Sequence, residues 1–134
     1  VAQVYATAMS LDFETNMWES LLGWQNSGLM SVNLTPLPAY QAFQIARESI
    51  GPATYTGEVL SSDVGGAPGI RGFKFVHEDG RQVWALWYVS MTEPSHAVTF
   101  TVQPGAAWDM LGNPLDLSTG LVVGVDPVYV EWTP

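Results

Sequence analysis

The 134-residue chain contains no cysteine. Disulfide bonds, thiol nucleophiles and cysteine-ligated zinc are therefore excluded. The absence of cysteine does not fix the cellular compartment, because many secreted proteins also lack cysteine. We expect the protein to be secreted or extracellular.

Basic residues are also scarce. Four Lys and Arg stand against 13 Asp and Glu, which gives a formal net charge of −9. Binding to nucleic acid or to an anionic membrane needs clustered basic side chains, so neither partner is expected. Long apolar runs are missing as well, since Asp, Glu, Asn or Gly interrupts every stretch, and no membrane-spanning segment is predicted. We interpret the acidity as a contribution to solubility.

Motifs for metals and cofactors are lacking. His77 and His96 are the only histidines, and no HxH, HExxH or Asp-rich calcium loop accompanies them. We expect both to be surface or sheet-edge residues, and we expect no metal and no cofactor. The glycine-rich stretch SSDVGGAPG has no following Lys-Ser/Thr or helix start, so it is interpreted as a flexible loop rather than a phosphate cradle. Asp109, which precedes a Gly-Asn-Pro turn, is expected to cap that turn's backbone amides.

The first 51 residues are predicted to form a helix, a strand and a second helix. Residues 1–11 have apolar positions at helical spacing, and residues 17–22 resemble a strand with two apolar faces. A helix is predicted over residues 36–50, with Thr35 as its cap and Pro36 in its first turn. Gly51 is expected to end it in a left-handed conformation. Its predicted apolar stripe consists of Ala39, Phe43, Ala46 and Ile50.

From Pro52 onward the apolar period changes from helical to two. Five runs rich in Val, Thr, Phe, Tyr and Trp follow, and HEDGRQ between two of them is typical of a hairpin turn. Short turns without intervening helices predict an antiparallel β-sandwich of five to seven strands. Val98, Phe100 and Val102 are expected on one face of one strand. The predicted strand at 82–90 is apolar on both faces, so we expect the helix at 36–50 to cover one of them.

We therefore predict a mainly β chain with an N-terminal α/β segment, divided into residues 1–51 and residues 52–134. A parallel strand at 17–22 needs partner strands in the same sheet, and residues 1–51 offer none. This pattern suggests that the segment is the end of an α/β barrel or doubly wound domain whose earlier repeats lie upstream. Two alternatives remain open: the strand joins the C-terminal sheet, or it pairs across a dimer formed through the N-terminal segment.

The order of motifs resembles the C-terminal end of clan A glycoside hydrolases of families 39 and 30, which are (β/α)8 barrels followed by a β-sandwich. The motifs that carry the resemblance are NMWESLLGW, SGLM, LTPLPAYQAF, GIRGFKFVHEDGRQVWALWYV, WDMLGNPL and DPVYVEW. The resemblance implies that Trp18, near the end of the last barrel strand, stacks on a sugar. The alternative interpretation is that Trp18 is a buried core residue.

The resemblance also places the two catalytic carboxylates of a retaining glycosidase upstream of Val1, at the ends of earlier barrel strands. Glu14, Glu19 and Glu48 match neither motif, so no catalytic residue is expected in this chain. It would then be the non-catalytic C-terminal portion of a glycoside hydrolase, whose sandwich stabilises the barrel and helps to shape the substrate cleft. Its partners would be the rest of the barrel and, through it, carbohydrate.

A free-standing carbohydrate-binding or adhesive sandwich is the alternative function. A binding module of this kind predicts solvent-exposed, coplanar aromatic rings, for which Trp84, Trp108 and Trp132 are the candidates.

Overall fold

The structure is a computed structural model that describes residues 1–13, 22 and 28–134. These residues form two α-helices, one short 3₁₀-helix and seven strands. In chain order the elements are α1 (Ala2–Ser10), α2 (Pro38–Ile50), β1 (Thr54–Glu58), η2 (Ser61–Val64), β2 (Ile70–Val76), β3 (Gln82–Tyr88), β4 (Ser95–Val98), β5 (Ala106–Asp109), β6 (Leu121–Gly124) and β7 (Val128–Trp132).

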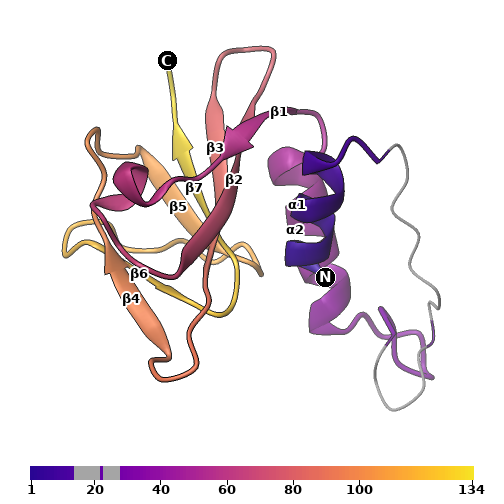
Figure 1. The fold of residues 1–134 in the computed structure, drawn as a ribbon. Coiled ribbons are helices and arrows are strands. Elements are labelled where there is room, and N and C mark those ends of the chain that lie inside the picture. The colour runs from indigo at the N-terminus through magenta and orange to yellow at the C-terminus, as the bar shows by residue number, and fades with distance from the viewer. Residues whose placement is uncertain (14–21, 23–27) are drawn as a thin grey trace.

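The strands form two antiparallel sheets that pack on each other. A five-stranded sheet has the order β1-β2-β3-β7-β5, and β4 pairs with β6 in a second sheet. Figure 1 shows α1 and α2 side by side on one side of the larger sheet, with β4 and β6 on its other side. The molecule is therefore a β-sandwich preceded by a helical segment, as the sequence predicted.

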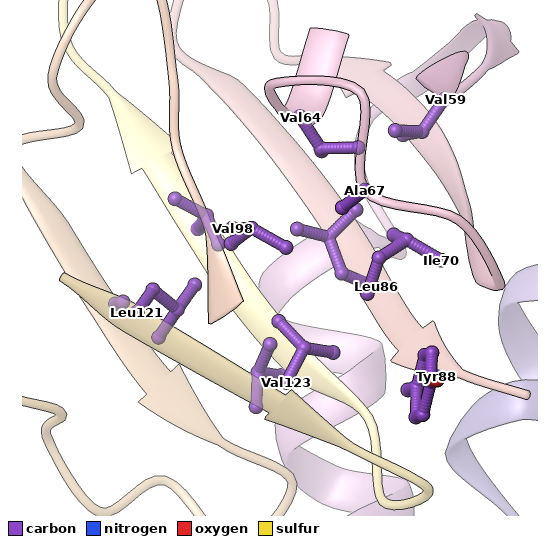
Figure 2. Close-up of a cluster of buried hydrophobic side chains, with 12 residues drawn as sticks. Val59, Val64, Ala67, Ile70, Leu86, Tyr88, Val98, Leu121 and Val123 are labelled. Atoms are coloured by element: carbon purple, nitrogen blue, oxygen red, sulfur yellow. The ribbon is translucent and has the colours of Figure 1, made fainter. Parts of the chain in front are cut away.

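The central strand β3 explains the three layers. Val83 and Ala85 are buried in a cluster with Ala46 and Ile50 of α2. The alternate residues of β3 point into the space between the sheets, where Leu86 packs with residues of β4 and β6 (Figure 2). A strand with both faces buried carries apolar residues at successive positions. The prediction that helix 36–50 covers this strand is confirmed.

The second helix begins two residues later than predicted. Leu37 is its N-cap in an extended conformation, with φ −92° and ψ 163°, and Pro38 occupies the first turn. Helical conformation is sterically disfavoured for a residue before proline, which agrees with the extended Leu37, and Thr35 is therefore not the cap. The predicted left-handed Gly51 is also wrong, because Gly51 is right-handed with φ −55°. The helix instead stops before Pro52, which cannot continue its hydrogen bonding.

Several strand boundaries differ from the expected runs. The run at 121–132 divides into β6 and β7, which belong to different sheets, and Pro127 lies between them. The alternation expected past Val98 is wrong, because β4 ends there and Val102 is exposed. The hairpin at HEDGRQ is confirmed: Val76 pairs with Gln82, and Gly80 has a φ of 88° that favours glycine.

The predicted strand at 17–22 lies outside the described residues except for Leu22. Leu22 forms one isolated parallel bridge with Met30. The predicted strand and its partners therefore remain a prediction.

Candidate functional site

The residues singled out by the family resemblance lie mostly outside the described part of the chain. Trp18, Glu14 and Glu19 belong to the segment that the structure does not describe. Glu48 is described, and it is an exposed residue of α2. The sugar-stacking role of Trp18 stays a prediction.

The three candidate tryptophans do not form one platform. Trp84 and Trp132 are half-buried neighbours, with ring centroids 4.5 Å apart and planes inclined by 47°. Trp108 packs in the cluster on the opposite, helix-covered face of the sheet, where its ring stacks on Tyr129 and its Nε1 donates to Ser49 Oγ at 3.1 Å. The prediction of coplanar rings is therefore wrong, because residues of adjacent strands at different positions face different layers.

Trp84 and Trp132 instead contribute to a hollow that we call the aromatic hollow. It has a volume of about 380 Å³ and lies where η2, the start of β3, the loop after β4 and the end of β7 meet. Phe100 completes the ring cluster: its centroid lies 5.3 Å from that of Trp132 and 6.1 Å from that of Trp84. The remaining lining residues are Ser62, Asp63, Gln82, Thr101, Val102 and Thr133.

An ion pair lies beside the aromatic hollow. Lys74 Nζ is 2.6 Å from Asp63 Oδ2 and 4.7 Å from the centroid of the Trp84 ring. Burial favours a raised pKa for Asp63, but hydrogen bonds from Lys74 and from the Leu60 N–H outweigh it and lower the pKa. Asp63 is therefore a carboxylate at neutral pH, and the nearby ammonium compensates its charge.

The histidines differ from each other. His96 lies in β4, at the edge of the small sheet, as expected, and its ring stacks on that of Tyr88 at the end of β3. His77 is buried, and its Nε2 lies 2.9 Å from the Ser49 carbonyl oxygen at the end of α2. The surface prediction for His77 is wrong because α2 covers the hairpin that carries this residue. Among the described residues there is no cluster of three or more His, Asp or Glu side chains that could hold a metal ion.

Asp109 caps its turn as predicted. Its Oδ1 accepts hydrogen bonds from the Leu111 and Asn113 backbone N–H groups at 2.8 and 2.9 Å, and its Oδ2 accepts from Asn113 Nδ2 at 2.8 Å. Burial favours a raised pKa for Asp109, but the hydrogen bonds from Asn113 and Leu111 outweigh it and lower the pKa. The carboxylate holds the turn whose Leu111 carbonyl oxygen accepts a hydrogen bond from Gln41 of α2.

An apolar surface on the helix layer is the second notable feature. Val4, Leu11 and Phe13 are 57%, 64% and 61% exposed, and together with Trp87 they line a groove of about 560 Å³. We call these four residues the apolar helix face. Contiguous exposed apolar residues of this kind mark surfaces that contact another protein segment. In the described ranges of the chain, neither helix is long and apolar enough to cross a membrane.

Comparison with known proteins gives a likeness of fold. No protein-family model and no curated protein matches the chain. Its structure is similar to part of a family 39 glycoside hydrolase from the gut symbiont Bacteroides cellulosilyticus WH2, with a TM-score of 0.68 and 14% sequence identity. The match covers 96% of this chain and 28% of that one, so the chain spans little more than a quarter of the solved enzyme. A glycoside hydrolase-related fold is thereby supported.

Proposed function

We propose that this chain is the non-catalytic C-terminal portion of a glycoside hydrolase. Residues 1–51 would be the last elements of its barrel, and residues 52–134 its accessory β-sandwich. The observation that carries the proposal is the fold likeness to a family 39 glycoside hydrolase, which extends over 96% of this chain and so includes both the helices and the sandwich. The motif order in the sequence supports the same interpretation.

Contacts between the helix layer and the sheet support a stabilising role for the sandwich. Ile50 and Ala46 of α2 are fully buried against Val83 and Phe75 of the sheet. Full burial of a side chain such as that of Ile50 contributes roughly 1.5–3 kcal/mol to the free energy of folding. A helix attached in this way to a rigid sheet would in turn hold the barrel end to which it belongs.

Polar contacts fix the same helix in register. Ser49 receives the Trp108 indole N–H at its Oγ and contacts His77 through its carbonyl oxygen, while Gln41 Nε2 donates to the Leu111 carbonyl at 2.6 Å. These bonds reach α2 from two separate loops and one strand of the sandwich. The sandwich would therefore limit movement of the last barrel helix.

The apolar helix face is the surface on which the rest of the barrel would pack. It consists of exposed residues of α1 and of the segment after it, together with Trp87 of β3. Helices of an α/β barrel pack on neighbouring helices and on the strands, and both contacts are apolar. The remaining 72% of a chain such as the matched hydrolase would supply that cover.

A turnover assay tests the proposal. The chain is incubated with 4-nitrophenyl β-xyloside and β-glucoside, and release of nitrophenol is followed. We expect none, because a retaining glycosidase needs two carboxyl groups about 5 Å apart and the proposal places both upstream. Turnover that disappears in the Glu19→Gln or Glu48→Gln variant would contradict the proposal.

The coding sequence upstream of Val1 provides a second test. It should encode α/β repeats with an Asn-Glu pair and a later Glu at the end of a strand.

The alternative of a free-standing carbohydrate-binding or adhesive module is less well supported. Its predicted platform of Trp84, Trp108 and Trp132 is not formed, because Trp108 packs under the helices. Pairing of the N-terminal segment across a dimer is the remaining form of this alternative.

A further inference from the structure

We infer that the aromatic hollow binds a neutral glycan segment. The inference concerns the sandwich alone and goes beyond the accessory role proposed above, because it holds whether or not the chain is part of a hydrolase. It is carried by three observations on one surface: a cluster of rings, neutral polar side chains that have no hydrogen-bond partner within the described part of the chain, and a compensated charge.

The ring cluster offers an apolar wall with a firm support. Trp84 contacts both the Lys74 ammonium, which lies 4.7 Å from its ring centroid, and the Trp132 ring, whose centroid lies 4.5 Å away. Trp132 and Phe100 are half-buried and line the hollow, which leaves part of each ring available. The indole of Trp132 is fixed by a hydrogen bond from its Nε1 to the Val102 carbonyl at 2.9 Å. Rings held in this way lose little freedom when a ligand packs on them.

The polar side chains at the hollow have unused hydrogen-bonding capacity. Gln82, Thr101, Thr133 and Ser62 are exposed, and none of their side-chain groups has a hydrogen-bond partner among the described residues. The amide of Gln82 and the three hydroxyl groups can each donate and accept hydrogen bonds. Sugar hydroxyl groups also donate and accept hydrogen bonds, whereas the C–H faces of a pyranose ring are apolar. The combination of rings with neutral amide and hydroxyl groups therefore matches a saccharide.

The charge at the hollow selects for a neutral ligand. Among the described residues that line the hollow, Asp63 is the only ionised one, and Lys74 pairs with it at 2.6 Å. The chain as a whole carries −9, which disfavours an anionic ligand. A cationic ligand would have to displace Lys74 from an existing ion pair. Uronic acids and phosphorylated sugars are therefore disfavoured, and a neutral glycan is favoured.

The topology disfavours an extended peptide. Peptides that join a sheet need an edge strand with free backbone groups. The strands beneath the hollow are β3 and β7, and each already pairs with a strand on both sides. A volume of about 380 Å³ lies at the low end of the usual range for ligand sites, about 300–1,000 Å³, and suits a short segment of a chain molecule.

The test is titration of the ¹⁵N-labelled chain with cellohexaose, xylohexaose and mannohexaose, followed by NMR. The indole N–H signals of Trp84 and Trp132 are the reporters. We expect saturable shifts of both signals with at least one of the three sugars, at a Kd between about 10 μM and 1 mM. The Gln82→Ala variant should weaken binding about three- to tenfold, as expected for one lost neutral hydrogen bond.

Matched variants separate binding from folding. Gln44→Ala removes another exposed glutamine, which lies on α2, and should leave the affinity unchanged. Trp132→Phe keeps a ring in place and should weaken binding, and thermal unfolding of each variant verifies the fold.

The inference is overturned if no sugar moves either indole signal at about 10 mM, well above a millimolar Kd. It is equally overturned if a proline-rich decapeptide produces the shifts and the sugars do not. Neither result bears on the turnover assay above.

Discussion

At the scale of single residues, Asp109 has the most clearly defined role. Its carboxylate accepts two backbone N–H bonds and one side-chain bond in the turn that follows β5. Asp109→Ala should lower the free energy of unfolding at pH 7 by about 1–3 kcal/mol, since the turn amides lose a charged acceptor. Urea unfolding measures this change. Asp116→Ala is the control, because its carboxylate caps one amide of an exposed loop and should cost less.

The same residue gives a pH dependence. The pKa of Asp109 is lower in the folded chain than its ordinary value of 3.8. The stabilisation is therefore present above the unfolded pKa and is lost as the pH falls through the folded pKa. The difference in unfolding free energy between wild type and Asp109→Ala should shrink below about pH 3.8. A difference that stays constant down to pH 2 would assign the effect to packing rather than to the carboxylate.

At the scale of elements, the end of α2 depends on a contact that crosses 59 positions of sequence. Trp108 Nε1 donates to Ser49 Oγ, while the Trp108 ring stacks on Tyr129. Trp108→Phe keeps a ring but removes the donor, and Ser49→Ala removes the acceptor. A double-mutant cycle should give a coupling energy of about 0.5–1.5 kcal/mol in chemical unfolding. Strictly additive effects of the two changes would show that the bond does not hold α2 on the sheet.

At the scale of the whole molecule, the apolar helix face should promote self-association of the chain by itself. We expect the apparent mass in sedimentation equilibrium to rise with concentration, since apolar surface left in water is covered by a second copy. Val4→Gln should reduce this association. Val122→Gln is the matched control, because Val122 of β6 is 59% exposed, close to the 57% of Val4, but lies on the opposite layer. Equal effects of both variants would contradict a role for the helix face.

The predictable part of the fold came from local patterns. The two apolar faces of β3, the hairpin around Gly80 and the Asp109 turn each depend on residues close together in sequence, so each was predicted correctly. The start of α2 was missed although its cause is local, because Pro36 and Pro38 both satisfy the preference for a first-turn proline. Only the restriction on Leu37 before Pro38 distinguishes them.

The aromatic hollow was not predictable in the same way. Gln82 lies opposite Trp132 only because β3 pairs with β7 in this register, with about 50 residues of chain between them. Phe100 joins the rings from a loop that was expected to continue as a strand. A sequence pattern reports which face of its own strand a residue occupies, but not which strand becomes its neighbour.

By itself, then, the sequence determined the composition of the layers: a helical segment, a run of antiparallel strands, and one strand apolar on both faces. Those features follow from side-chain period and turn chemistry, which act over a few residues. Only the tertiary structure decided that His77 and Trp108 lie under α2, and that Trp84, Trp132 and Phe100 gather at one end of the sandwich. The physical reason is that burial and pairing across long stretches of chain are settled by packing, not by local preference.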